Sequence, residues 1–354
     1  MENGARFCLS FSIFHFPFSI LIVLLSLPAQ GQLLPNLGGQ RVGISALTFL
    51  KNDISPRSMA MGGANVTTQG DLYSAATNPA LMSEVRTAGL SASTMRYGQG
   101  ALLHSQVTAA YPLTVSGTLF AQYHMLNMGN EAIRTEFQPY GTGQTFSAYS
   151  LSAGLGYSQN LSDRFSAGVT LKFMQEKLAQ YTANAFSADV GFLYRVDFRN
   201  LRFAAALQHF GTNSTLSGNY NADVLGTGTQ TGTSGYPAPT LFKMGAQIDA
   251  FRQGEHLLTA HLQLNHPNDN SENIRIGAEY AYAQLFYARL GIKLGVDNEQ
   301  IPSGGLGLKT NFGRNAIMLD YAVFQSRYLG LYQQLGIRFS LAPMETETVT
   351  PVSN

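Results

Sequence analysis

The chain has 354 residues, and charged side chains make up only 12% of them, whereas about 25% is usual in soluble globular proteins. Glycine (36), phenylalanine (22) and tyrosine (17) are abundant, and the formal net charge is +1. This composition argues against a water-covered helical surface and favours a sheet with one face against lipid. The charge gives no reason to expect a nucleic-acid partner.

The first 31 residues are predicted to be a secretory signal peptide. An apolar run from Phe7 to Pro28 is followed by the small residues of Ala29-Gln30-Gly31, which would leave Gln32 as the mature start. The run is also long enough to span a membrane, so a retained anchor is the alternative, and the cleavage-like residues favour the signal peptide. Cys8, the only cysteine, lies inside this segment, so the mature chain has no thiol for a disulfide or a metal site.

Residues 32–86 do not show the pattern of spanning strands, and we expect them to form a plug or periplasmic segment ahead of the barrel. Gly62-Gly63 permits a tight turn with positive φ, and no lysine follows it as a phosphate cradle would require. Asn78-Pro79-Ala80 is typical of a turn, and residues 71–77 would form a short helix or turn between the two motifs. A compact element here would fill a lumen too wide for wall side chains to close.

From residue 87 onward, apolar and small or polar residues alternate in segments of about ten, and no stretch of ~18 apolar residues appears. Successive side chains of a strand point to opposite faces, so each segment has one apolar face. The sequence therefore predicts an all-β fold, a transmembrane antiparallel β-barrel over residues 87–342 with about 14 strands, an even number as is usual for such barrels. The segments are 87–95, 101–111, 114–124, 146–158, 163–175, 182–195, 201–209, 239–249, 255–265, 272–282, 285–294, 302–312, 315–325 and 331–341.

The connections between these segments alternate in length. Every second connection is short, whereas the other set includes the two longest, near 125–145 and 210–238. Short periplasmic turns and long external loops are typical of outer-membrane barrels, and residues 343–354 would form a periplasmic tail. The segment near 210–238 is rich in Gly, Thr, Ser and Asn, which favours a plain surface loop over a binding loop.

Isolated charged residues occur on the polar faces of the predicted strands, among glycine and alanine. This pattern favours an enclosed lumen over a secreted β-sandwich, whose many exposed faces would need more charge. Such residues more often pair with one another and fill a barrel than line a substrate path. The chain has no tryptophan, so Tyr and Phe would have to form the aromatic girdles. The lumen-facing candidates are Lys172, Arg202, Arg275, Glu279, Arg289, Lys293, Lys309, Asp320 and Arg338.

No motif supports catalysis or cofactor binding. The sequence has no Gly-x-Ser-x-Gly, no His-Glu-x-x-His and no Walker-type Gly-Lys-Ser/Thr. His256 and His261 are five residues apart on one predicted strand, so they face opposite sides and cannot share a metal. We expect a protein that is not an enzyme, with no cofactor and no metal.

Two stretches resemble a known family. The run "SPRSMAMGGANV…NPAL" and the segment 165–196, whose alanine-rich part ends in Asp189-Val190-Gly191, are similar to the PorV/PorQ family of outer-membrane proteins. That family is related to FadL-type barrels and belongs to the type IX secretion system of Bacteroidota. The resemblance covers essentially the whole mature chain. It implies a fourteen-stranded barrel with an N-terminal plug-like segment in the outer membrane.

The resemblance also implies a function. PorV-like members bind the C-terminal signal domains of exported cargo and carry them to the surface-attachment machinery, whereas PorQ-like members are accessory components. The first hypothesis is therefore an outer-membrane component of type IX secretion whose partners are outer-membrane lipid and secretion proteins or cargo signal domains. The alternative is a FadL-like channel for uptake of hydrophobic small molecules, for which Gly304-Gly305 leaves room for a wall opening. A third is a purely structural barrel.

Overall fold

The computed structural model describes residues 43–97, 102–217, 235–296, 302–313, 315–327 and 330–341. All of them belong to the compact unit that runs from Asn36 to Asn354. The predicted signal peptide and the predicted tail at 343–354 lie outside the described residues and stay predictions. Among the described residues, no helix is long and apolar enough to cross a membrane.

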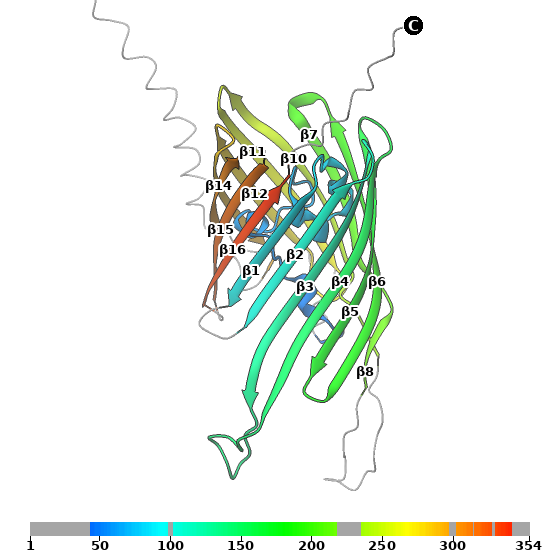
Figure 1. The fold of residues 1–354 in the computed structure, drawn as a ribbon, viewed down its shortest axis with the longest axis vertical. Coiled ribbons are helices and arrows are strands. Elements are labelled where there is room, and N and C mark those ends of the chain that lie inside the picture. Colours follow the sequence, from blue (N-terminus) through cyan, green and yellow to red (C-terminus); the bar gives the residue numbers. More distant parts are fainter. Residues whose placement is uncertain are drawn as a thin grey trace, which may run out of the picture. The chain divides into compact units, whose positions relative to one another are not determined.

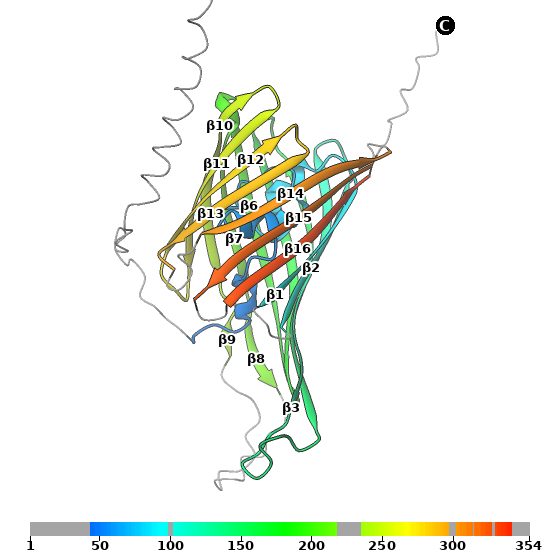
Figure 2. The ribbon, with the colours of Figure 1, turned by 90° about the vertical axis from the view of Figure 1, so that its left-hand side faces the viewer.

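Fourteen antiparallel strands form a closed ring, as the alternating pattern predicts (Figure 1). Each strand pairs with its neighbour in the chain, β1 pairs with β16, and a β5–β6 pairing completes the circle. The strands run obliquely around the barrel (Figure 2). They are β1 (Gly89–Tyr97), β2 (Leu103–Pro112), β3 (Gly117–Ala132), β4 (Thr145–Asn160), β5 (Phe165–Leu178), β6 (Tyr181–Val196), β7 (Leu201–Gly211), β10 (Leu241–Gln253), β11 (His256–Pro267), β12 (Asn273–Tyr282), β13 (Phe286–Leu294), β14 (Ser303–Phe312), β15 (Asn315–Ser326) and β16 (Gly330–Ser340).

The two regions predicted as the longest loops are partly strand, which corrects the sequence-based expectation. β3 and β4 extend to Ala132 and from Thr145, so their loop spans only residues 133–144. Beyond the end of β7, the short strand β8 (Asn213–Ser217) pairs with β6, and β9 (Tyr236–Pro237) pairs with β8. Polar residues can form strands there because the hydrogen bonds of a sheet join backbone groups, which are the same for every type of side chain.

The outer and inner faces of the wall have inverted polarity relative to a soluble protein. On β5, Val169 and Leu171 are 46% and 67% exposed, whereas Thr170 and Lys172, which alternate with them, are buried. Large apolar side chains face outward on every strand pair in this way, as expected for a surface that contacts lipid. Tyr and Phe near the strand ends beside the short connections supply an aromatic girdle without Trp; they are Tyr111, Tyr157, Phe165, Tyr194, Phe203, Phe251, Tyr282, Phe286 and Phe312.

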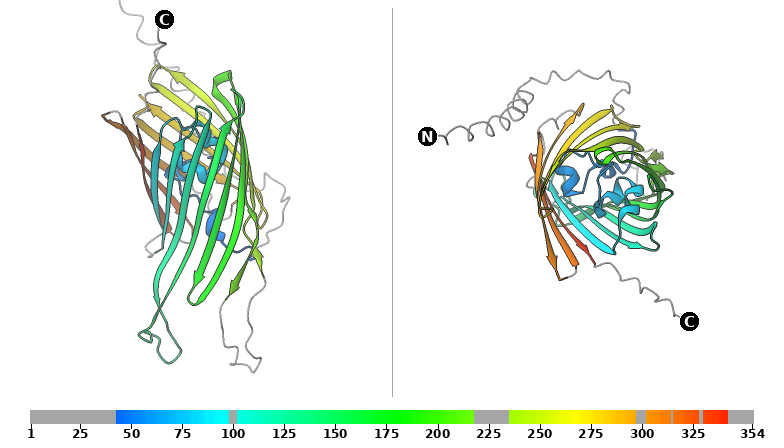
Figure 3. Two further views of the ribbon diagram at one scale, coloured as in Figure 1. Left: turned by 45° about the vertical axis from the view of Figure 1, so that its right-hand side comes forward. Right: turned by 90° about the horizontal axis from the view of Figure 1, so that it is seen from above.

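The segment before β1 lies inside the ring, and we call residues 43–88 the plug (Figure 3). It contains η1 (Thr48–Lys51), α2 (Pro56–Ala60), η2 (Leu72–Ala76) and η3 (Pro79–Glu84). Three of these short helices begin at a side-chain cap, because Ser55, Asp71 and Asn78 each accept a hydrogen bond from a backbone N–H of the first turn. Proline follows Ser55 and Asn78, where its missing N–H costs nothing. A further helical turn, η4 (Phe198–Asn200), joins β6 to β7.

Candidate functional site

Glycines on the inner face of the wall allow the plug to lie directly on the strands. A Cβ added to Gly291 would lie 1.9 Å from the carbonyl carbon of Met61, and one added to Gly168 would lie 2.5 Å from that of Pro79. Neither glycine has a positive φ. Glycine is therefore required at these positions because a side chain would not fit, and not because of the backbone conformation. The abundant glycine of the sequence is thus partly explained by contact with the plug at Gly168, Gly191, Gly245, Gly277, Gly291, Gly305 and Gly336.

The predicted Gly62-Gly63 motif forms a turn against β13 and β14. Both residues have positive φ, 65° and 83°, and the Gly62 N–H donates to Ser303 Oγ at 3.0 Å. A Cβ on Gly62 would lie 2.7 Å from the backbone nitrogen of Ile292. The pair therefore serves backbone geometry and close approach.

The predicted Asn78-Pro79-Ala80 motif lies against a different part of the wall, at β5 and β6. Asn78 Oδ1 accepts from the Ala80 N–H at 3.0 Å, and its Nδ2 donates to the carbonyls of Val66 at 3.0 Å and Phe192 at 3.2 Å. Asn78 is fully buried. One side chain thus starts η3, joins two parts of the plug and fixes them to β6, so the two motifs attach the plug at separate places.

A chain of six alternating charges joins the plug to the wall on β12 to β16. Arg57 of α2 binds Glu279 through two hydrogen bonds of 2.7 and 2.6 Å. Glu279 also accepts from Arg289 at 2.6 Å, and Arg289 binds Asp320 at 2.6 Å. We call these residues, with Arg338 and Asp71, the ion-pair chain.

The ion-pair chain returns to the plug at its far end. Arg338 lies 3.1 Å from Asp320 and 3.4 Å from Asp71, which precedes η2, and it donates to the Gly70 carbonyl at 3.1 Å. Three arginines thus face three carboxylates with no charge left over. Each member is largely buried, so removal of one partner would leave an uncompensated charge in a site poor in water. The sequence pattern located the four wall residues, but Arg57 and Asp71 carry no local signal and were missed.

The other predicted lumen residues fall into different places. Arg202 pairs with Glu84 of η3, and Lys172 pairs with Asp189 of β6; both cations are buried. Lys309 is partly buried near the end of β14, away from these clusters. Arg275 and Lys293 line a pocket between plug and wall.

This pocket, which we call the plug pocket, has a volume of about 460 Å³ and opens among residues of the longer connections, such as Asn270 and Val296. One side is apolar and includes Met59, Met95 and three rings. The Tyr97 and Tyr332 rings are 4.9 Å apart between centroids, and the Tyr332 and Phe324 rings are 5.6 Å apart. None of these rings was predicted from the sequence. The only indication that the sequence carries is an aromatic residue at an inward-facing position of a strand.

The opposite side of the plug pocket is polar, and its cations have partners. Lys51 binds Asp269 at 2.8 Å, and Arg275 donates to Asn273 at 3.2 Å and lies 3.8 Å from Asp53. Lys293 Nζ lies 4.8 Å from the Phe324 ring centroid, a cation–π contact. The pocket is therefore amphipathic without a large excess of charge, and in the described part of the chain no group of three His, Cys, Asp or Glu is arranged to hold a metal.

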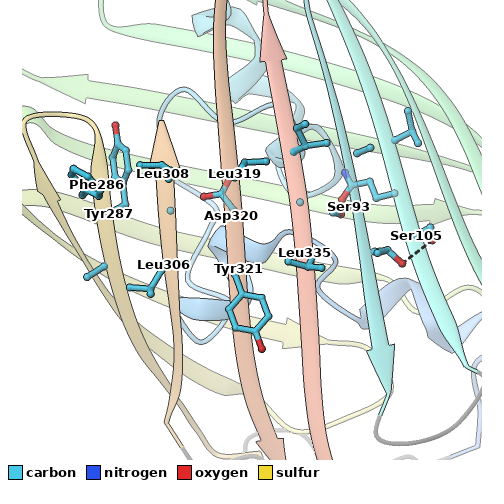
Figure 4. A pocket seen from close by; sticks show the side chains of 18 of the residues that line it. Ser93, Ser105, Phe286, Tyr287, Leu306, Leu308, Leu319, Asp320, Tyr321 and Leu335 are labelled. Atoms are coloured by element: carbon cyan, nitrogen blue, oxygen red, sulfur yellow. Dashed lines mark hydrogen bonds between the residues drawn. The ribbon is translucent and has the colours of Figure 1, made fainter. Parts of the chain in front are cut away.

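A larger hollow of about 960 Å³ lies across β12 to β16, β1 and β2. Figure 4 shows its lining, with Leu306, Tyr321 and Leu335 side by side on β14, β15 and β16, and Leu319 beside Leu308 in the next row. These side chains are exposed on the outer, apolar face. The hollow is thus a concave stretch of the lipid-facing wall, and we do not assign the ligand site to it.

The wall is continuous where the sequence left room for an opening. Gly304 pairs with Leu290 and Val323, and Gly305 pairs with Arg289 and Ala322, so the ladder is unbroken on both sides. The β6–β7 pair does contain a bulge, in which Gln208 and His209 stand opposite Asp189. His209 has φ 57° and its N–H donates to Asp189 Oδ1 at 2.8 Å, so the side chain compensates for the interrupted ladder.

No protein-family model matches the sequence, and no curated protein matches it. Solved structures do match. The Ralstonia pickettii toluene transporter TbuX has a TM-score of 0.52 at 12% identity, with 80% of this chain and 96% of that chain covered. The CymD monoaromatic hydrocarbon channel has a TM-score of 0.55 at 11% identity, covering 82% and 98%. A Pseudomonas aeruginosa FadL homologue has a TM-score of 0.51 at 11% identity, covering 86% and 98%.

At such low identity these likenesses show the fold. The chain has the β-barrel fold of FadL-like outer-membrane proteins, which supports an outer-membrane location. This agrees with the FadL-type part of the resemblance seen in the sequence.

Proposed function

We propose that the protein takes up small hydrophobic molecules across the outer membrane and binds them in the plug pocket. The observation that carries this proposal is the pocket itself, which combines three aromatic rings and two methionines with a polar side. Ligand pockets of a few hundred Å³ that combine apolar and aromatic walls with oriented polar groups are typical of small-molecule sites, and here the rings form the apolar side of a lining that is otherwise largely polar. Two of the similar structures are described as a toluene transporter and a monoaromatic hydrocarbon channel, which supports the same class of ligand.

The attachment of the plug constrains the route of uptake. The ion-pair chain holds the plug on β12 to β16, and Asn78 holds it on β6. Expulsion of the whole plug would break both contacts and leave buried charges without partners. Passage therefore requires local movement of the plug beside the pocket, where Lys51 to Asp53 form one boundary.

The absence of tryptophan allows a direct binding test. Phe324→Trp places a single indole in the plug pocket, and Phe312→Trp places one on the outer face, where Phe312 is 75% exposed. With bromobenzene as the quencher, we expect saturable quenching at position 324 that toluene reverses, and quenching linear in concentration at position 312. Linear quenching at both positions would contradict binding in the pocket. Proteoliposomes then measure whether bound molecules are transported.

A second candidate is the role in type IX secretion that the sequence resemblance implies. One observation favours it: β3 to β6 have 14 to 16 residues, whereas the other barrel strands have 9 to 13. Their hairpin tip exposes Phe137 at 94% and Tyr140 at 99%, which suits contact with a protein partner. Affinity isolation from native outer membranes tests this function. Recovery of secretion proteins, and loss of cargo display on gene deletion, would support it; normal display would argue against it.

A further inference from the structure

The hollow of about 960 Å³ in the lipid-facing wall, which we call the wall hollow, is polar at one end. It crosses the seam where β1 pairs with β16 and the barrel closes. Thr94 of β1 and Ser105 of β2 face outward there, and their hydroxyls share a hydrogen bond of 3.3 Å (Figure 4). The outward side chains farther along the two strands and on β16 are apolar, at Val107, Leu335 and Ile337.

A cation without a partner lies just beyond these hydroxyls. Arg96 is the next outward-facing residue of β1 after Thr94, so the two Cα atoms are about 7 Å apart. Its side chain is exposed, and within the described part of the chain it has no ion pair, hydrogen bond or ring contact. Gln333 of β16 stands opposite Arg96 in the ladder and is also exposed.

These residues lie at the external end of the barrel wall. β1 ends at Tyr97, at the same end of the barrel as the longer connections, and long connections are external in outer-membrane barrels. Arg96 and Gln333 therefore lie at the level of the lipid headgroups of the outer leaflet. The apolar part of the wall hollow lies deeper, among the hydrocarbon chains.

The order of groups along the wall matches the order of groups in a membrane lipid. A guanidinium and an amide come first, two hydroxyls follow, and an apolar hollow comes last. A phosphate-bearing lipid presents its phosphate, its ester linkages and its hydrocarbon chain in the same order. Arginine binds phosphate through charge-assisted hydrogen bonds, and hydroxyls can donate to ester carbonyls.

We propose that the wall hollow binds one anionic, phosphate-bearing lipid of the outer leaflet. Its phosphate lies on Arg96 beside Gln333, its ester linkages lie at Thr94 and Ser105, and one of its chains lies in the hollow. Because Arg96 belongs to β1 and Gln333 to β16, the bound lipid joins the first and last strands across the seam. It would thus resist separation of these two strands.

A second copy of the chain fits the wall hollow less well. A two-fold contact places the same surface of each copy against itself, and two concave surfaces would leave a void between them. Among the described residues that line the wall hollow, Asp320 is the only charged one, and it faces the lumen, where it binds Arg289 at 2.6 Å. A partner copy would therefore bring no carboxylate from this surface to Arg96.

The test uses the absence of tryptophan. Leu335→Trp places one indole in the wall hollow. Leu262→Trp is the matched control, in a second outward-facing hollow of about 500 Å³, whose external end is bordered by Phe242 and by His266, which is paired with Glu272. The two leucines are 59% and 54% exposed. Each variant is placed in phosphatidylcholine bilayers that contain a fixed fraction of a lipid with brominated chains, either phosphatidylglycerol or phosphatidylcholine, because bromine quenches a neighbouring indole.

At position 335, brominated phosphatidylglycerol should be preferred over brominated phosphatidylcholine by about fivefold, the effect of one arginine beside an anionic headgroup. At position 262 the two lipids should quench equally. Arg96→Gln in the Leu335→Trp background should remove the preference, whereas Arg134→Gln, which makes the same change of charge in the β3–β4 loop, should leave it. Equal quenching by the two lipids at position 335, or the same preference at position 262, would overturn the proposal.

A second measurement needs no tryptophan. Native mass spectrometry of the unaltered protein in detergent, offered equal amounts of the two lipids, should show a retained phosphatidylglycerol adduct that Arg96→Gln loses. Equal retention of both lipids would overturn the proposal. Inorganic phosphate, offered alone, should not be retained, and its retention would show an anion site that does not need the lipid chain, which would also overturn the proposal. Neither measurement depends on uptake or on the plug pocket, so this proposal and the proposed function fail separately.

Discussion

Arg57 of the plug and Glu279 of the wall, 222 positions apart in the chain, are joined by two hydrogen bonds of 2.7 and 2.6 Å. Such a bidentate contact is among the strong hydrogen-bonded interactions that an arginine and a carboxylate can form. It also begins the ion-pair chain that ends at Asp71, so the plug is held at both ends of one charged network.

Arg57→Met should destabilise the protein by about 3 kcal/mol, because Glu279 would keep only Arg289 as a partner in a buried site. The free energy of unfolding in denaturant measures this. Arg164→Met is the matched control, since Arg164 and Asp197 are 58% and 82% exposed and such surface pairs contribute about 0–1 kcal/mol. Similar losses in the two variants would show that the network does not anchor the plug.

Gly291→Ala should disturb the plug through size alone. The new methyl group would lie 1.9 Å from the Met61 carbonyl carbon, so plug or strand must move, at a cost of about 1–3 kcal/mol. Gly304→Ala is on the adjacent strand, where the methyl would lie 3.5 Å from the Leu290 side chain, and it should change stability by less than about 0.5 kcal/mol. Unfolding midpoints compare the two; a tolerated Gly291→Ala would mean that the plug is loosely held.

Tyr73→Phe tests the contact between η2 and β1. The Tyr73 hydroxyl donates to the Ala92 carbonyl at 3.2 Å, and its loss should cost about 1 kcal/mol. Burial raises the pKa of Tyr73 well above its usual value. The folded state therefore holds this proton more tightly than the unfolded state, and the associated stability is present below about pH 10 and lost as the pH rises further. The phenylalanine variant should show a shallower alkaline decline; identical declines would contradict this assignment.

Phe137→Ser with Tyr140→Ser tests the hairpin tip. Both rings are almost fully exposed, so the double variant should unfold within about 0.5 kcal/mol of the unaltered protein. If the tip binds secretion proteins, their recovery from native membranes should fall while toluene binding in the plug pocket is unchanged. Full recovery would remove the tip from the proposed interface.

The strands were predictable from the sequence because the signal is local. Alternation along 165–173 or 286–294 records which side of a pleated strand each residue occupies, and that needs no knowledge of the partner strand. The fourteen strands and the buried side of residues such as Lys172 and Arg289 follow from it. The turn residues of Gly62-Gly63 and Asn78-Pro79 are equally local, since they depend on backbone conformation and short-range hydrogen bonds.

What the plug touches was decided by the tertiary structure alone. The pairing of Arg57 with Glu279, the fit of Met61 on Gly291 and the meeting of Tyr97, Phe324 and Tyr332 each join segments far apart in the chain. Closure of the barrel brings β1 beside β16 and encloses residues 43–88. A single sequence carries no periodicity for contacts of that range, because they depend on the register of every strand between them.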